Sequence, residues 1–409
     1  MMNDEKILDV TNDVKWIGIL DRDIVTFDIV METEYGTTYN SYFINAGKKA
    51  IVETAKEKFW PVYEAKIRKV VNPTEIEYII MDHTEPDHSG SLPHLLKIAP
   101  NATVVGSGNA IRYLSDQLNM EFKSLVVKDG DSLNLGNKTL RFIAAPNLHW
   151  PDSIYTYLEE DKVLFTCDSF GAHFCHDEMY DDKVGNYDDA FKYYFDVILK
   201  PFSKFMLKAI EKIRPLEINA ICTGHGPILR SNWKRIVDLS EKFANEFIEL
   251  TDPNKKSVVV MYVSAYGYTR EMGEAIAEGV KKAGVETVTL LDIEKIELGE
   301  LDSALTSHNG FAIGCPTLNQ NILLPVYKLF ALISPLRDRG KPAISFGSYG
   351  WSGEGVKIMD AVMRNLKLNV VSDGLAEKFR SGQFKKEKFV EYGKTFGTAI
   401  MACRGTAEK

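Results

Sequence analysis

The chain has 409 residues, a formal net charge of −8 at pH 7 and a hydrophobic fraction of 45%. This length predicts two or three domains, and either half is long enough to bury a core. Lysine and arginine are spread without a basic stripe, so we expect no nucleic-acid partner, and no apolar run approaches the length of a membrane span.

The N-terminus and the cysteines indicate the compartment. Residues 1–6 are charged and lack the apolar core of a signal peptide. The five cysteines form no Cys-x-x-Cys pair, which excludes a rubredoxin-type iron centre and a thioredoxin motif from this chain. We therefore expect a cytoplasmic protein without a membrane partner. Cys167 and Cys222 end apolar strands, and we interpret them as small buried hydrophobes.

Strands and helices alternate through the first 250 residues. Residues 14–53 are predicted to form short strands joined by turns, and residues 186–250 to be largely helical, with aromatic side chains that pack. This mixture predicts two sheets covered by helices. The other predicted elements are helix 56–70, strand 76–81, helix 92–98, strand 102–106, helix 108–117 and strands near 124–127, 132–135 and 139–144.

Four metal-ligand side chains occupy six residues directly after the strand 76–81. They are the ligands of the motif His83-Thr84-Glu85-Pro86-Asp87-His88. Pro86 argues against an ordinary helix through the motif, so we expect a loop at the end of a strand. Imidazole suits iron, zinc and copper, while carboxylates add hard oxygen ligands, so the motif can serve two adjacent metals. The absence of cysteine argues against a structural zinc site.

Three further candidate ligands are each predicted at the end of a strand, followed by glycine, proline or a turn: His149, Asp168 and His225. The order His-x-Glu-x-Asp-His, then His, then Asp, then Gly-His-Gly resembles the metallo-β-lactamase fold, and this resemblance implies an αββα sandwich. Glu85 stands where zinc hydrolases of that fold carry a second histidine, which resembles the flavodiiron proteins. The resemblance implies two irons per subunit. It assigns His83, Glu85 and His149 to one iron, Asp87, His88 and His225 to the other, and Asp168 to a bridge between them.

The segment after Asp168 is expected to lie over the mouth of the metal site. It contains His173 and His176, followed by an acidic stretch at 177–182. Either histidine could bond substrate or donate a proton, and either could equally be an ordinary loop residue. Both interpretations stay open.

A new βαβ series begins after the polar, proline-containing segment 251–256, which predicts domains at 1–252 and 253–409. The apolar run 257–263 is typical of a buried parallel strand, and Gly284 is predicted to end the helix that follows. The loop between them offers hydroxyl groups and a helix N-terminus to an anion, without the lysine of a Walker loop. It therefore favours a monophosphate such as that of FMN.

Two later loops are expected at the same edge of this doubly wound sheet, where ligands bind and aromatic rings can stack on a flat cofactor. Three such loops in this order resemble a flavodoxin, which implies FMN. The candidate FMN-binding residues are Ser264, Ala265, Tyr266, Gly267, Tyr268 and Thr269, then Pro316, Thr317, Leu318 and Asn319, then Ser348, Tyr349, Gly350, Trp351, Ser352 and Gly353.

The combined resemblance implies an oxidoreductase that reduces O2 to water, with NO as an alternative acceptor. Within the family the chain most resembles the stand-alone methanogen enzymes that oxidise reduced coenzyme F420; rubredoxin is the alternative donor. The family also implies a head-to-tail homodimer or a tetramer. Two competing interpretations are a dizinc hydrolase with a flavodoxin tail and an electron carrier with a degenerate first domain.

Overall fold

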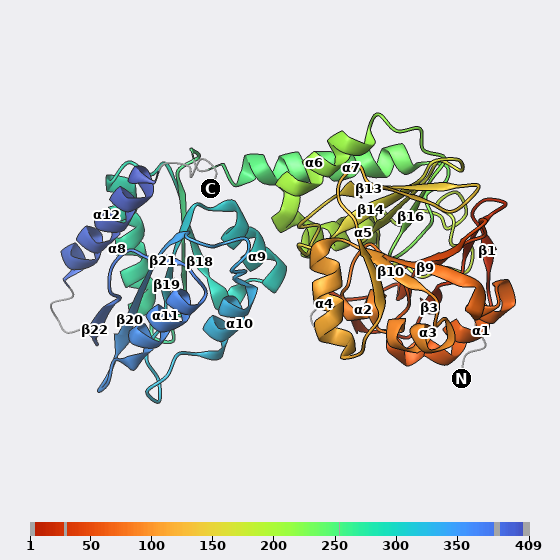
Figure 1. Ribbon diagram of the computed structural model, residues 1–409. Helices are drawn as coiled ribbons and strands as arrows, with labels where there is room; N and C mark the ends of the chain where they lie inside the picture. Colours follow the sequence, from red (N-terminus) through yellow and green to blue (C-terminus); the bar gives the residue numbers. More distant parts are fainter. Residues whose placement is uncertain (1–4, 28–30, 253, 380–384, 404–409) are drawn as a thin grey trace. The chain divides into compact units, whose positions relative to one another are not determined.

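The computed structural model describes residues 5–27, 31–252, 254–379 and 385–403 (Figure 1). The chain forms two compact units, Met1–Glu246 and Phe247–Lys409. The division falls within helix α7 (Trp233–Leu250), because this helix starts in the first unit and its last turn leads into the second. The sequence places the boundary slightly later, at 252/253, and Pro253 lies outside the described residues.

Two sheets form the centre of the first unit. Within the described residues, one has seven strands in the order β1-β2-β7-β8-β9-β10-β11, and the other has five in the order β12-β13-β14-β15-β16. Their bounds are β1 (Leu8–Asp9), β2 (Val14–Trp16), β7 (Tyr42–Ile44), β8 (Lys49–Val52), β9 (Ile76–Met81), β10 (Thr103–Gly106), β11 (Lys123–Val126), β12 (Ser132–Asn134), β13 (Thr139–Ala144), β14 (Ile154–Leu158), β15 (Val163–Cys167) and β16 (Ala220–Thr223). Two short ribbons pair β3 (Ile19–Asp21) with β6 (Thr37–Tyr39), and β4 (Thr26–Phe27) with β5 (Met31–Glu32).

Helices cover the outer face of each sheet. A core that includes Val52, Ile80 and Phe165 lies between the two sheets, because these strands are apolar on both faces. A second core packs α1, α3 and α4 on the first sheet, and a third packs α5, α6 and α7 on the second. The result is the predicted αββα sandwich. The helix bounds are α1 (Trp60–Val70), α2 (Pro86–Ser89), α3 (Leu92–Ile98), α4 (Gly108–Leu118), α5 (Asp188–Tyr194) and α6 (Ser203–Ile213), with a π-helical turn at Phe195–Leu199.

The prediction of a helix-free metal motif is wrong in one detail. Asp87 and His88 lie on the single helical turn α2, which begins at Pro86. Proline is compatible with the first position of a helix, because its missing N–H would have no partner there and its fixed φ already suits the helix. Pro86 therefore starts a short helix instead of preventing one, while His83 and Glu85 lie on the loop before it.

The second unit is a parallel sheet with helices on both faces (Figure 1). Its strand order is β18-β17-β19-β20-β21, with β22 also paired to β20. One face packs on α9, α10 and α11 and the other on α8 and α12. The bounds are β17 (Ser257–Tyr262), α8 (Tyr268–Lys282), β18 (Thr287–Asp292), α9 (Leu298–Ser307), β19 (Gly310–Gly314), α10 (Leu324–Leu332), β20 (Pro342–Tyr349), α11 (Glu354–Asn365), β21 (Asn369–Val370), β22 (Leu375–Lys378) and α12 (Lys386–Ala402).

Among the described residues, no helix combines the length and the apolar composition that a membrane crossing requires.

Candidate metal centre and flavin site

The seven predicted ligands come together at one edge of the sandwich. Glu85 and its neighbours follow β9, Asp168 follows β15 and His225 follows β16. The prediction that His149 ends a strand is wrong, because it lies in the turn between β13 and β14. It nevertheless reaches the site, because β14 runs antiparallel to β15 and the start of β14 meets the end of β15. The sheet topology thus places ligands that are far apart in the sequence side by side. Five of the seven are buried, and Glu85 and His149 are partly exposed.

The first cluster consists of His83, Glu85, His149 and one oxygen of Asp168. The Nε2 atoms of His83 and His149 lie 3.3 and 3.0 Å from Oε2 of Glu85. The same two nitrogens lie 3.5 and 3.3 Å from Oδ2 of Asp168. Two imidazole nitrogens and two carboxylate oxygens therefore converge on one point.

The second cluster consists of Asp87, His88, His225 and the other oxygen of Asp168. The Nε2 atoms of His88 and His225 lie 3.3 and 3.1 Å from Oδ2 of Asp87. They lie 3.1 and 3.4 Å from Oδ1 of Asp168. Asp168 therefore presents one oxygen to each cluster, which is the arrangement of a bridging carboxylate.

Both clusters have the donors and the spacing of a metal site. Metal–nitrogen and metal–oxygen bonds of about 2.0–2.2 Å place neighbouring ligand atoms about 3.0–3.4 Å apart, close to the separations in both clusters. The two oxygens of Asp87 and the two of Asp168 are buried and lack a conventional hydrogen bond among the described residues. Buried carboxylates without such bonds require cations beside them. The residues therefore fit two metal ions.

The charges of the cluster are mutually dependent. Burial disfavours the charged form of His83, but Asp152, Glu85 and Asp168 outweigh it and raise its pKa to about 10. Asp168 and Glu85 likewise raise the pKa of His149 to about 9 against the effect of burial. Burial would raise the pKa of Asp168, yet His88, His149 and His83 hold it well below its usual value. Cations, either protons or metal ions, are therefore held between these carboxylates.

The residues that contact the Nδ1 atoms of the candidate ligand histidines, the ring nitrogens that point away from the clusters, were not predicted from the sequence. Nδ1 of His83 lies 3.2 Å from Asp152, and Nδ1 of His88 lies 3.3 Å from Glu53. Nδ1 of His225 lies 2.5 Å from the carbonyl oxygen of Thr38. Asp152 and Glu53 each stand at the end of a strand or turn, but only the fold brings them to the rings. Such outer contacts orient metal-binding histidines.

Cys167 and Cys222 are buried, as predicted. Cys167 does more than fill space, because its Sγ lies 3.5 Å from Nδ1 of His88. The prediction of a simple hydrophobe is therefore incomplete for Cys167. Burial raises the pKa of its thiol well above the usual value, so it is a thiol and not a thiolate near neutral pH.

His173 lies against the second cluster, whereas His176 contacts other loop residues. The ring centroids of His173 and His225 are 5.3 Å apart, and Nδ1 of His173 lies 2.9 Å from Oγ1 of Thr37. Nε2 of His173 and the hydroxyl of Tyr194 are buried without a hydrogen-bond partner in the described part of the chain. His176 stacks on the ring of Phe174 and accepts a hydrogen bond from a backbone N–H.

The three predicted flavin loops follow neighbouring parallel strands. β17 pairs with β18 on one side and with β19 on the other, so the sheet order reverses beside β17, where ligands of this fold bind. Oγ1 of Thr269 lies 3.0 Å from Oγ of Ser348, which joins the first loop to the third. The N–H of Thr317 donates to the carbonyl oxygen of Ser348 at 2.8 Å, which joins the second loop to the third.

The same loops have the groups that FMN requires. Ser264 lies at the start of the first loop, and Gly267 (φ +86°) lies directly before α8, whose first N–H groups can receive a phosphate. Tyr266 and Trp351 are 78% and 73% exposed, so two flat rings are available to stack. Of the predicted residues, Tyr268 and Thr269 begin α8, Ser348 and Tyr349 end β20, and the others lie on the loops that follow β17, β19 and β20.

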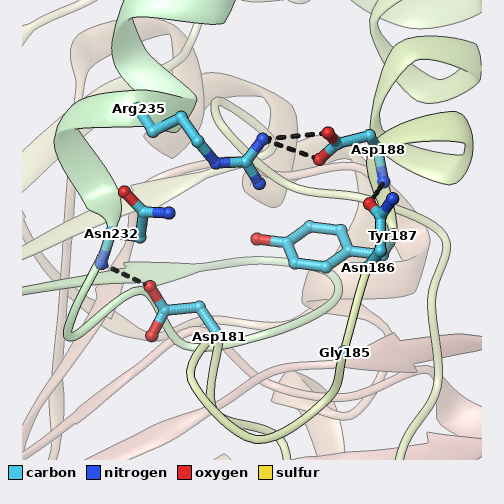
Figure 2. Close-up of a pocket in the computed structure, with 7 residues that line it drawn as sticks. All are labelled: Asp181, Gly185, Asn186, Tyr187, Asp188, Asn232 and Arg235. Atoms are coloured by element: carbon cyan, nitrogen blue, oxygen red, sulfur yellow. Dashed lines mark hydrogen bonds and ion pairs between the residues drawn. The ribbon is translucent and has the colours of Figure 1, made fainter.

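A separate polar cavity of about 300 Å³ lies beside the start of α7 (Figure 2). Arg235 Nη1 lies 2.8 and 3.0 Å from the two carboxylate oxygens of Asp188, and Asp181 accepts a backbone N–H bond from Asn232. The charges of Arg235 and Asp188 are therefore paired with each other, and the carboxylate of Asp181 is hydrogen-bonded to backbone N–H groups. The lining of the cavity contains none of the predicted metal or flavin residues. It consists of Asp181, Gly185, Asn186, Tyr187, Asp188, Asn232 and Arg235.

Two family models match the chain in the order of its units. The model described as ODP family beta lactamase matches residues 37–226, and the flavodoxin model matches residues 260–391. The predicted metallo-β-lactamase-like and flavodoxin-like folds are thus confirmed.

Curated relatives and solved structures resemble nearly the whole chain. Flavo-diiron protein FprA2 of Clostridium acetobutylicum is 36% identical over 94% of this chain and 97% of its own. Type A flavoprotein fprA of Rhodobacter capsulatus is 34% identical over 95% and 89%. The flavodiiron protein of Giardia intestinalis is 30% identical with a TM-score of 0.67, covering 97% of both chains. Rubredoxin oxygen:oxidoreductase of Desulfovibrio gigas is 26% identical with a TM-score of 0.71, covering 97% and 99%.

Fold, metal-ligand clusters, flavin loops and relatives agree, and they exclude a degenerate first domain. The chain belongs to the flavodiiron protein family, oxidoreductases whose cofactors are FMN and a non-haem diiron centre.

Proposed function

We propose that this protein reduces O2 to water with electrons that enter through FMN, and thereby removes oxygen. The proposal depends chiefly on the position of Asp168. One of its carboxylate oxygens faces the first histidine–carboxylate cluster, and the other oxygen faces the second. When bound, two ferrous ions and a reduced flavin supply the four electrons that convert one O2 and four protons to two water molecules. A dizinc site could not supply these electrons.

The proposed ligand sets follow the two clusters. One iron is held by His83, Glu85 and His149, and the other by Asp87, His88 and His225, with Asp168 shared. Metal analysis of the purified protein tests this assignment. Two irons and little zinc per chain are expected, whereas two zinc ions per chain would favour the hydrolase.

His173 and Tyr194 are proposed to face the substrate. Nε2 of His173 is buried without a hydrogen-bond partner in the described part of the chain, and the hydroxyl of Tyr194 lies near the carboxylate of Asp168. A bound oxygen molecule offers acceptors for their hydrogens. Burial and the neighbouring His225 lower the pKa of His173 to about 3, so its ring is neutral at pH 7. It can then donate through one ring nitrogen without adding a positive charge to the site.

The FMN is proposed to lie on the three loops of domain 253–409, with domain 1–252 holding the irons. As electron donor we propose reduced coenzyme F420. The exposed rings of Tyr266 and Trp351 support this donor, because a planar deazaflavin can approach FMN where flat surfaces remain accessible. Stopped-flow measurement of flavin bleaching without oxygen tests it. Fast bleaching by the reduced deazaflavin alone is expected.

Rubredoxin is the second candidate donor, and NO the second candidate acceptor. The Desulfovibrio gigas relative is named for rubredoxin and oxygen, which favours a protein donor. Bleaching by reduced rubredoxin and none by the deazaflavin would establish this alternative. Turnover with O2 and with NO, each measured with the same donor, separates the two acceptors.

A head-to-tail homodimer, alone or within a tetramer, is proposed as the active assembly, because it would bring the flavin of one subunit to the irons of the other. Partly exposed apolar side chains at Tyr193, Val197 and Phe205 support such an interface. Sedimentation during activity measurement tests it, and a fully active monomer would exclude it. A cytoplasmic location is also proposed, supported by the five free cysteines.

A further inference from the structure

Glu53 connects the backbone of the metal motif to one ligand ring. It follows β8 and is 2% exposed. Its Oε1 accepts hydrogen bonds from the backbone N–H of Asp82 at 2.5 Å and of His83 at 3.1 Å. Its Oε2 lies at ion-pair distance, 3.3 Å, from Nδ1 of His88 and has no hydrogen-bond partner in the described part of the chain, while Sγ of Cys167 lies 3.5 Å from the same nitrogen. One buried carboxylate therefore spans the start of the motif and its last ligand.

Asp152 has the same kind of contacts on the other side of the motif. Its carboxylate lies 3.2 and 3.3 Å from Nδ1 of His83. It also accepts hydrogen bonds from the backbone N–H of Thr84 at 2.8 Å and from the Thr84 hydroxyl at 2.7 Å. Like Glu53, it joins a backbone N–H of the motif to the outer nitrogen of a ligand ring.

The backbone at Glu53 is held in a conformation that aims this side chain. Its φ is +60°, which is uncommon for a residue other than glycine. The N–H of Glu53 donates to the carbonyl oxygen of Ile80, and its own carbonyl oxygen accepts from the hydroxyl of Ser41 at 2.8 Å. Such strain persists where surrounding contacts determine the conformation. Glu53 is thus preorganised toward His88.

We propose that Glu53 and Asp152 are a matched pair of positioning residues, each serving one metal position. A histidine that binds metal through Nε2 carries its hydrogen on Nδ1, and a carboxylate that accepts this hydrogen fixes the ring and strengthens the ligand. Glu53 does this for His88 and Asp152 for His83. The inference rests on the ligand sets proposed above. It adds that the two metal positions are stabilised separately, each by its own buried acid.

Iron occupancy at each position tests the pairing. Crystals of Glu53→Ala, Glu53→Gln and Asp152→Asn, prepared after dialysis against a ferrous chelator, are measured at the iron absorption edge. Loss of such an outer partner weakens metal binding about 10–100-fold. Glu53→Ala is expected to lose iron beside His88 and keep it beside His83, and Asp152→Asn to show the reverse. Glu75→Ala, which removes an exposed acid, is the matched control and is expected to keep both irons.

Glu53→Gln is the decisive variant if Glu53→Ala does not fold. Its carbonyl oxygen can still accept the backbone N–H bonds, but its amide donors face the Nδ1 hydrogen of His88. Selective loss beside His88 is again expected. Equal loss at both positions, or full occupancy at both in a folded variant, would overturn the inference.

The variant His88→Ala separates this inference from the ligand assignment. If His88→Ala keeps full iron occupancy at the second position, the proposed ligand set fails. If His88→Ala loses that iron while folded Glu53 variants keep it, the ligand set stands and the positioning role of Glu53 is wrong. Mixed-valent EPR spectra of the same proteins give a second readout, since ring orientation alters the signal of a bound iron pair.

Discussion

Replacement of Asp168 by alanine removes the carboxylate that both clusters share. Its Oδ1 lies 3.1 Å from His88 and 3.4 Å from His225, and its Oδ2 lies 3.3 Å from His149 and 3.5 Å from His83. The variant therefore loses one oxygen ligand at each metal position. Glu85 and Asp87 remain, one per cluster.

The expected effect follows from this geometry. Removal of a residue that only hydrogen-bonds to a metal ligand lowers metal affinity about 10–100-fold. Removal of a direct ligand that both metals share should lower it further. We expect iron to fall from two per chain to below about one, and oxidase turnover to fall at least 100-fold. If the free iron concentration is about 100 times the Kd of a site, loss of binding at that site also lowers the free energy of unfolding by about 2.7 kcal/mol.

Asp168→Asn distinguishes a bridge from a general loss of charge. The amide presents one oxygen and one NH2 group, and the NH2 group cannot bind a metal. About one iron per chain is therefore expected, measured by metal analysis alongside oxygen consumption. Asp116→Ala removes an exposed acid and serves as the control. Two irons and unchanged turnover in Asp168→Ala would refute the bridging role.

Three further predictions concern protons and flavin. Binding of two ferrous ions to the metal-free protein at neutral pH should release about three protons, measured with an indicator dye. The reason is that His83, His88 and His149 have raised pKa values and must lose a proton to bind metal. The absence of proton release would contradict this prediction. The metal-free protein should lose stability as the pH rises from about 6.5 to about 10, since its folded state binds more protons than the unfolded state across this window. A Tm that rises with pH would be inconsistent with those shifts. Trp351→Ala should weaken FMN binding about tenfold, measured by flavin fluorescence, and unchanged affinity would exclude stacking by this ring.

Much of the candidate site was predictable because its ligands lie in short motifs beside strong secondary-structure signals. The apolar run before His83 predicts a strand, and a ligand at a strand end tends to reach the edge of a sheet. The same reasoning applies to Asp168 after β15 and to the glycine-rich loops after β17 and β20. Helix α2 was missed because the effect of Pro86 depends on whether it starts a helix or interrupts one.

The sequence by itself determined the order of the two folds, and it named the candidate metal ligands and the candidate flavin loops. Only the tertiary structure decided how the ligands are shared. The two oxygens of Asp168 serve different clusters because β9, β15 and β16 bring their ends together from two sheets. It also decided that Glu53 and Asp152 hold His88 and His83, contacts that span 35 and 69 positions of the chain. Such contacts leave no local pattern, because they depend on packing between strands and not on residue spacing.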